Sequence, residues 1–161
     1  MTPNPAVRRE QSGSPLEEAY GFAHAVAAGD RVLVSGTLPV VDGEVRGEGS
    51  PYEQALLALR NALAALEPFG LGADSVVRTR LYLSHARDAD DVGRAHAEVL
   101  GAVRPVSTMV VVAGFTDSRV LVQVEIEAFG GSREARDARG ARGAREESET
   151  REEREDRGDP A

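Results

Sequence analysis

Residues 120–129, VLVQVEIEAF, alternate between two sets of side chains, which is the pattern of a β-strand whose two faces meet different environments. One face of this strand is apolar, while the other carries Gln123, Glu125 and Glu127. The same division occurs in residues 76–83, where we expect the first face to carry Val77, Thr79, Leu81 and Leu83 and the second Arg78, Arg80 and Tyr82. These strands predict a sheet with one face in the core and a polar row on the other.

Two segments predict amphipathic helices that would cover such a sheet. In the first, Ser50 is a helix cap, Pro51 takes the first helical position and Glu53 completes a capping box, while Gly70 supplies the stop. Its expected apolar stripe consists of Tyr52, Leu56, Leu59, Leu63 and Leu66. Residues 88–101 predict the second helix, with aspartates at its start and a glycine at its end.

The remaining strands complete an α+β chain. Residues 23–27 and 31–36 predict two short strands, and residues 105–115 and 120–129 predict two long ones joined by a hairpin-like return at residues 116–119. A third short strand before the first helix stays open. Because two helices reach only one face of a sheet and strands near the end of the chain carry Val, Leu and Ile on both faces, we expect a symmetric oligomer to bury the other face.

Composition excludes several classes of function. The chain of 161 residues has the length of one domain, and its formal net charge of -8 disfavours nucleic acid as a partner. It has no cysteine, which excludes disulfides, thiolate metal sites and cysteine nucleophiles. It also has neither an apolar run of signal-peptide length nor one long enough to cross a membrane. We expect a cytoplasmic protein with no membrane partner.

The two ends differ in composition from the middle. We treat residues 1–14 as a flexible lead, residues 15–130 as the folded domain and residues 131–161 as a disordered tail of mixed charge. The tail has no large apolar side chain, so it lacks the surface that would offset the entropy of ordering. An interaction segment and a solubilising extension are both compatible with this composition.

Three stretches together resemble one known family: GDRVLVSGT at 29–37, DSVVRTRLYL at 74–83, and RPVSTMVVVAGF followed by VQVEIEAF at 104–129. They are similar, in this order and spacing, to the Rid family, the YjgF-type reactive intermediate deaminases that are also called L-PSP endoribonucleases. The resemblance spans about residues 22–128. It implies a chorismate-mutase-like fold, with a mixed six-stranded sheet and two helices on one face.

The same resemblance implies a homotrimer with a central barrel, whose small-molecule ligands bind in clefts between subunits. The activity it implies is hydrolysis of reactive imines and enamines to carbonyl compounds and ammonia, a form of metabolite damage control. It implies neither a metal nor an organic cofactor.

Several positions depart from the family pattern. Deaminating members carry an arginine two residues after the proline of a P-x-R strand, and its guanidinium holds the substrate carboxylate. The matching residue here is Ser107, whose short neutral hydroxyl cannot make that charge-assisted contact. Phe22 stands in a Gly-Phe pair where the family often has Pro-Tyr, and Gly93 stands where it often has Asn. We therefore expect a substrate other than the usual 2-imino acid.

Other positions match the family. Glu125 corresponds to the carboxylate that directs the attacking water, and Ser35, Gly36 and Thr37 correspond to the strand end that lines the cleft. The resemblance thus implies Glu125 as the catalytic residue and Phe22, Ser35, Gly36, Thr37, Gly93 and Ser107 as substrate-binding residues. Glu127 is interpreted as structural. In the competing interpretation, both glutamates are merely exposed or paired with Arg78 or Arg80.

Two further interpretations concern a replacement for the missing guanidinium, which stays open, and a metal site, which is disfavoured. Arg104 precedes the P-x-S strand and is a candidate replacement for the missing guanidinium, although adjacent strand positions point to different sides. The spacing of His24, His85 and His96 fits no compact ligand set, so we expect no metal.

The function remains a choice between two classes. The first is a cofactor-independent hydrolase acting on a small imine or enamine without the usual carboxylate. The second is a trimer that binds a small molecule or regulates a partner without turnover.

Overall fold

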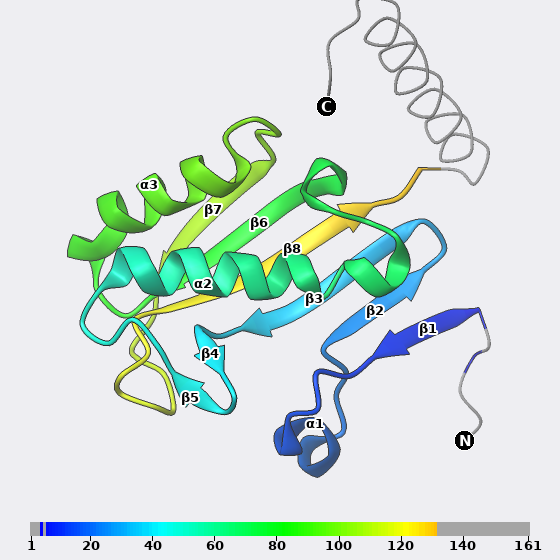
Figure 1. Ribbon diagram of the computed structural model, residues 1–161, viewed down its shortest axis with the longest axis horizontal. Helices are drawn as coiled ribbons and strands as arrows, with labels where there is room; N and C mark the ends of the chain where they lie inside the picture. Colours follow the sequence, from blue (N-terminus) through cyan, green and yellow to red (C-terminus); the bar gives the residue numbers. More distant parts are fainter. Residues whose placement is uncertain (1–3, 5, 132–161) are drawn as a thin grey trace, which may run out of the picture. The chain divides into compact units, whose positions relative to one another are not determined.

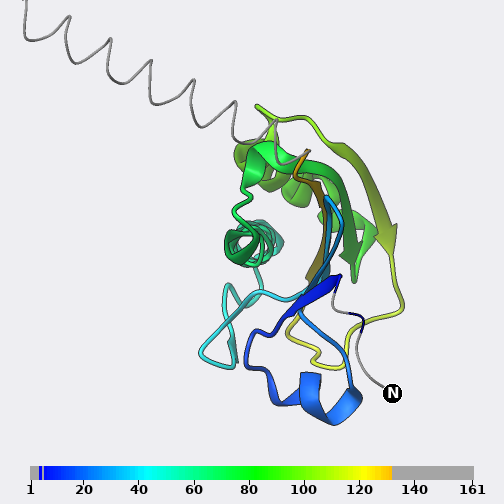
Figure 2. The same cartoon turned by 90° about the vertical axis from the view of Figure 1, so that its right-hand side faces the viewer.

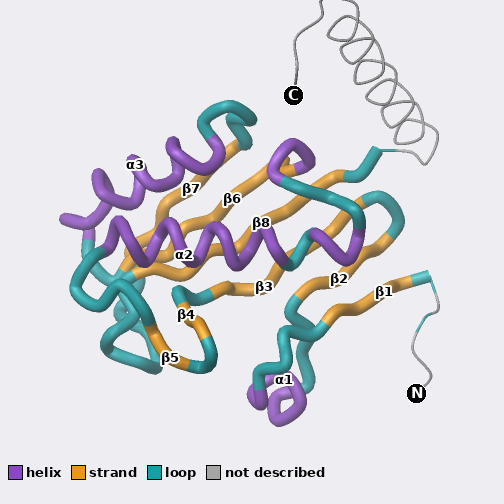
Figure 3. Tube along the Cα trace, in the orientation of Figure 1, coloured by secondary structure: helices purple, strands orange, loops and turns teal. Residues whose placement is uncertain are grey.

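The computed structural model describes residues 4 and 6–131, and Figures 1 and 3 show how its elements follow one another. The strands are β1 (Val7–Glu10), β2 (Ala25–Ala28), β3 (Arg31–Thr37), β4 (Val40–Val41), β5 (Glu44–Val45), β6 (Val76–Leu83), β7 (Val106–Val111) and β8 (Val122–Phe129). The helices are α1 (Pro15–Tyr20), α2 (Pro51–Ala64) and α3 (Ala89–Leu100), with 3-10 turns η1 (Glu67–Phe69), η2 (Ala73–Ser75) and η3 (Ala86–Asp88). This composition confirms the α+β class.

Six strands form one mixed sheet, as the family resemblance implies, and their order is β1-β2-β3-β8-β6-β7. β6 and β7 run parallel, and the other neighbouring pairs are antiparallel. β4 and β5 form a separate small hairpin. Asp42 and Gly43 connect these two strands, and both have the positive φ that tight hairpin turns require.

The predicted hairpin between the last two strands is wrong, because β6 lies between β7 and β8 in the sheet. The chain leaves β6, forms α3 and returns as β7 parallel to β6, which is the connection that a crossover helix makes. Residues 112–121 then carry the chain past β6 to the start of β8. The sequence shows two apolar strands that follow one another along the chain. It does not show that β6 lies between them in the sheet.

The N-terminal region also differs from the expected flexible lead. β1 pairs with β2 from Val7 opposite Ala28 to Glu10 opposite Ala25, and so forms an edge of the sheet. The guanidinium of Arg8 also stacks over the Phe69 ring at 4.5 Å. These ladder bonds and this stacking explain why so polar a stretch forms a strand. The predicted charged tail lies outside the described residues, apart from residue 131.

Helix α2 begins as predicted and ends earlier. Ser50 caps it by accepting a hydrogen bond from the Glu53 backbone N–H, and a proline occupies the first turn. The helix ends at Ala64, whereas Gly70 ends the following turn η1. Its fully buried positions are Gln54, Ala55, Ala58, Leu59 and Ala62, so small residues bring the helix close to the sheet. Tyr52, Leu56 and Leu63 of the predicted stripe pack at its margin.

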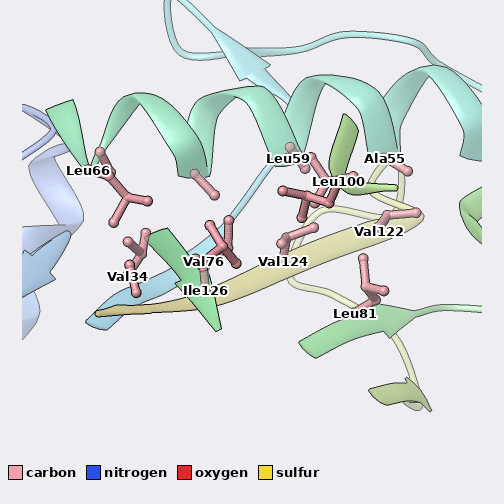
Figure 4. Close-up of a cluster of buried hydrophobic side chains, with 14 of the residues drawn as sticks. Val34, Ala55, Leu59, Leu66, Val76, Leu81, Leu100, Val122, Val124 and Ile126 are labelled. Carbon is pink, nitrogen blue, oxygen red and sulfur yellow. The ribbon is translucent and has the colours of Figure 1, made fainter. Parts of the chain in front are cut away.

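Helices α2 and α3 lie on the same face of the sheet, which is clear in the side view of Figure 2. The core between the layers, shown in Figure 4, contains Val34, Leu59, Leu66, Val76, Leu81, Leu100, Val122, Val124 and Ile126. Val77 was expected in this core but is exposed, because the pairing of β6 with β8 shifts register between Val76 and Arg78. This bulge turns Val76 inward instead.

Gln54 anchors the connection between β7 and β8. Its fully buried side chain donates from Nε2 to the Arg119 carbonyl at 2.8 Å, and its Oε1 accepts from the Leu121 N–H at 2.7 Å. The amide therefore satisfies both a backbone acceptor and a backbone donor just before β8 begins.

Replacing Gln54 by Leu keeps a similar volume but leaves both backbone groups unpaired. We expect the free energy of unfolding, measured by urea denaturation at fixed protein concentration, to fall by about 2 kcal/mol or more. The matched control is Gln11→Leu, since Gln11 is exposed. Equal stability of the two variants would contradict the anchoring role.

Candidate functional site

The face of the sheet opposite α2 and α3 contains a cavity of about 320 Å³. Most of its lining residues belong to strands β3, β6 and β8, and Ala23 lies shortly before β2. It is lined by Ala23, Leu33, Val34, Ser35, Arg78, Arg80, Glu125, Ile126 and Glu127. The polar row that the sequence predicts on β8 thus opens into a hollow of small-molecule size.

Arginines and glutamates pair across this face. Arg80 lies 3.2 Å from Glu125 and 3.8 Å from Glu127, while Arg78 and Arg31 lie 3.5 Å and 3.1 Å from Glu127. The Glu127 side chain is only 14% exposed and contacts three guanidiniums, whereas Glu125 is 34% exposed and contacts one. Both glutamates are therefore paired, as the competing interpretation allowed, but Glu125 is the more accessible carboxylate.

Tyr82 lies on the same face, two residues along β6 from Arg80. Burial is the largest cause that raises the pKa of its phenol, followed by the charge of Glu125 and a hydrogen bond with it. The phenol therefore stays protonated at neutral pH and can donate to Glu125. Tyr82 and Arg80 were expected on this face, but the sequence did not assign either of them to the site.

The strand end of β3 is irregular where it meets the cavity. The pairing of β3 with β8 shifts register between Val34 and Thr37. Gly36 lies against Gln123, because a Cβ at this position would come within 2.5 Å of the Gln123 amide nitrogen. Thr37 is buried and donates from Oγ1 to the Ser35 carbonyl at 2.9 Å. Of the three predicted residues on β3, Ser35 lines the cavity, and the other two shape the bulge beside it.

Ser107 lies on the other face of the sheet from Glu125. It pairs in register with Thr79, and the Thr79 Oγ1 donates to the Ser107 Oγ at 2.9 Å. The Nε2 of His96, on α3, lies 2.9 Å from the same Thr79 oxygen. Thr79 is fully buried, whereas Ser107 is exposed on the edge strand. One chain therefore does not bring Ser107 and Glu125 together.

The other predicted residues are distributed between these regions. Gly93 lies in α3 on the side of β7, since a Cβ there would lie 3.6 Å from the terminal methyl of Met109. Phe22 is exposed and precedes the cavity residue Ala23. Arg104 is exposed and has a positive φ of 55°, at the turn before β7.

The contact between Thr79, His96 and Ser107 was missed by sequence reasoning. A signal for it exists: a threonine on the buried face of a strand needs a hydrogen-bond partner. The partners were not identifiable, because they come from positions 17 and 28 residues away.

Metal and membrane features are absent from the part of the chain that the structure describes. Within it, no group of three or more histidine, aspartate or glutamate side chains is arranged to hold a metal ion. Nor does any described helix have the length and apolarity needed to cross a bilayer.

Comparison with known proteins identifies the family. The sequence model described as endoribonuclease L-PSP matches residues 13–130. The chain belongs to this family. It is 59% identical over 127 residues to the uncharacterized protein SCO2049 of Streptomyces coelicolor, covering 79% of this chain and 95% of that protein.

Solved structures of the YjgF/L-PSP family share the fold. Rv2704 of Mycobacterium tuberculosis, described as a member of the highly conserved YjgF/YER057c/UK114 family, superposes with a TM-score of 0.69 at 34% identity, over 76% of this chain and 98% of that chain. TdcF of E. coli, solved with bound serine, has a TM-score of 0.63 at 21% identity, over 76% of this chain and 93% of that chain. The second likeness concerns the fold alone.

The position of His96 predicts a pH dependence. Burial lowers the pKa of His96 below its ordinary value of about 6.5, and burial also lowers that of His24, opposed by Glu17. The unfolded chain then binds more protons than the folded chain, so the contribution to stability is present above about pH 6.5 and is lost as the pH falls below it.

We expect the free energy of unfolding to decrease between about pH 7.5 and pH 5, and to decrease less in His96→Gln, which keeps a donor for Thr79. Urea unfolding at several pH values and one protein concentration measures the difference. The slope does not vanish in the variant, because His24 still titrates. Parallel curves for the variant and the wild type would show that His96 makes no such contribution.

Proposed function

We propose that the protein is a cytoplasmic Rid-type hydrolase that converts a small reactive imine or enamine to a carbonyl compound and ammonia, without a cofactor. The observation that carries this proposal is Glu125, an accessible carboxylate in a 320 Å³ cavity of a YjgF/L-PSP family fold. A carboxylate at hydrogen-bond distance from a bound water acts as a general base. Glu125 directs the water onto the imine carbon, and the Tyr82 phenol and the Arg80 guanidinium hold the carboxylate in place.

The substrate class follows from Ser107. In place of a guanidinium, this position presents a neutral hydroxyl, so a substrate carboxylate finds no charge-assisted partner there. Arg104 supplies no replacement in this proposal, because its exposed side chain belongs to the turn before β7. We infer that the substrate is an imine or enamine without a carboxylate beside the reacting carbon. RNA cleavage is not proposed, since the net charge of -8 repels a phosphate backbone.

A homotrimer is part of the proposal. Ser107 and Gly93 lie on the helix side of the sheet near its edge, whereas Glu125 and Ser35 line the cavity on the opposite face. A cleft that contains both sets therefore requires two copies of the chain. Exposed apolar side chains supply surface for such an assembly: Leu33, Val106, Met109, Val110, Val111 and Phe129.

A second candidate is a protein that binds a small molecule or regulates a partner without turnover. The pairing of Arg80 with Glu125 at 3.2 Å favours it, because a carboxylate in an ion pair is less free to accept a proton from water. The alternating charges of the cavity also suit a zwitterionic ligand such as an amino acid. TdcF, which shares the fold, was solved with bound serine.

The test measures ammonia release from imines that an amine oxidase generates from primary amines, which lack the carboxylate. We expect a rate above that of buffer, and a loss of about 100-fold in Glu125→Gln, as removal of a general base produces. Glu44→Gln is the control, because Glu44 is exposed on β5 and does not line the cavity.

Imino acids made by an amino-acid oxidase test the substrate class. Ser107→Arg is expected to gain activity on them over the wild type. If the wild type turns over no imine and a stabilising ligand is recovered unchanged, the result would contradict the hydrolase and support the binding protein. An unchanged rate in Glu125→Gln would remove Glu125 from the mechanism.

A further inference from the structure

We propose that Arg78 holds a carboxylate at the far end of the substrate, and that the substrates are therefore ω-imino acids, whose imine carbon and carboxylate lie at opposite ends of the molecule. This inference rests on the proposed function, because it takes Glu125 as the place where the imine reacts. Arg78 lines the same cavity as Glu125, two positions before Arg80 on β6. It supplies the second end of a binding site for which Glu125 is the first.

The guanidinium of Arg78 is available to a ligand. Its side chain is 44% exposed, and its contact with Glu127 is made by one nitrogen, Nη1, at 3.5 Å. Arg31 contacts the same carboxylate more closely, at 3.1 Å, and does not line the cavity. A guanidinium presents five N–H donors in a planar fork that fits a carboxylate, so most donors of Arg78 remain for a ligand.

A bound carboxylate also suits the charge balance of this face. Among the described residues that pair there, three guanidiniums meet two carboxylates, which leaves a surplus of one positive charge. If Arg78 turns to a ligand, Glu127 keeps Arg31 at 3.1 Å and Arg80 at 3.8 Å. The ligand thus takes up the surplus charge without leaving a largely buried carboxylate unpaired, which is the costly outcome.

The register of β6 and β8 sets the distance between the two ends of the site. Glu125 lies opposite Arg80, and Glu127 lies opposite Arg78, so the two pairs are two residues apart along the strands. Two residues of a strand advance by about 7 Å. An extended chain needs about six single bonds to span that distance, since a backbone advances about 3.5 Å for every three bonds. 5-Iminopentanoate, with its imine and carboxylate at opposite ends, has this length.

The same substrate class accounts for the neutral residue at position 107. A carboxylate attached to the imine carbon meets only the hydroxyl of Ser107 in the proposed cleft, and it is too close to that carbon to reach Arg78. A carboxylate at the far end needs no guanidinium at position 107. The loss of one arginine and the presence of another therefore point to the same change of substrate.

The reaction balances with water as the second reactant. The water oxygen adds to the terminal imine carbon, the C–N bond breaks, and the products are an ω-oxo acid and ammonia. The carboxylate stays on Arg78 and takes no part in the bond changes. The reaction that supplies such a substrate is oxidation of the terminal amine of an ω-amino acid to an imine.

Two isomeric amino acids test the position of the carboxylate in the full-length protein. 5-Aminopentanoate is a stable substitute for the ω-imino acid, norvaline is its isomer with the carboxylate beside the amine, and pentylamine has the same chain without a carboxylate. Isothermal titration calorimetry at one pH and low salt gives each Kd. We expect 5-aminopentanoate to bind at least about tenfold more tightly than either of the others, as a charge-assisted contact provides.

Variants of Arg78 assign the preference to this side chain. Arg78→Gln removes the charge and is expected to abolish the preference, so that the two isomers bind alike. Arg78→Lys keeps the charge without the planar fork and is expected to retain part of it. The matched control is Arg60→Gln, which is expected to keep the full preference, because Arg60 is exposed on α2 at the other face of the sheet. Circular dichroism establishes that each variant is folded.

Three results would overturn the assignment: equal binding of the two isomers by the wild type, no binding of 5-aminopentanoate at millimolar concentration, or a preference that survives in folded Arg78→Gln. Binding requires no turnover, so this failure is distinguishable from failure of the proposed hydrolase. A preference without ammonia release from any imine contradicts the hydrolase alone. Ammonia release without the preference contradicts the ω-imino acid class alone.

Discussion

The architecture depends on the strict alternation of side chains along β8. Its apolar side chains pack under the helices, and its glutamates reach the opposite face. Because a slip of one residue would bury both glutamates, the register of β8 between β3 and β6 is fixed by hydrophobic burial. The same alternation that builds the core thus creates the charged cavity.

Strand β6 carries polar side chains on both faces of the sheet. Adjacent residues of a strand point to opposite sides, so Thr79 turns towards α3 and Ser107 while Arg80 turns towards Glu125. Two polar regions that are separate in one chain are therefore connected through neighbouring backbone positions. In the homotrimer that we propose, the edge of one sheet carries Ser107 to the charged face of another copy, and the proposed site is shared between the two.

Local sequence patterns predicted the features that depend on neighbouring residues, namely the start of a helix and the two faces of a strand. Ser50 identifies the start of α2 because its side chain accepts a hydrogen bond from the Glu53 N–H. The other half of the predicted capping box is replaced, since the Ser50 N–H donates to the Gly47 carbonyl. The alternation in β6 and β8 predicted which face carries Arg80 and Glu125, although a bulge displaced Val77. Family resemblance, rather than pattern, singled out Glu125 and Ser107 as site positions.

The sequence did not predict which strands and side chains from distant parts of the chain pair with one another. β7 pairs with β6 in parallel because the chain crosses over through α3 between the two strands. Nothing within residues 105–129 distinguishes that arrangement from a hairpin. The hydrogen bonds of Thr79 likewise depend on a helix and a strand brought together by the fold.

The measurement that tests the composite site most directly uses the absence of cysteine from the chain. Ser35→Cys and Ser107→Cys are combined in one variant, treated with a short bismaleimide, and analysed on a denaturing gel. Within one chain, β8 and β6 separate these strands by about 14 Å and the side chains face opposite sides. Covalent dimers and trimers in the double variant, and none in either single variant, are the predicted result. A double variant that remains monomeric on the gel would contradict a site shared between two copies.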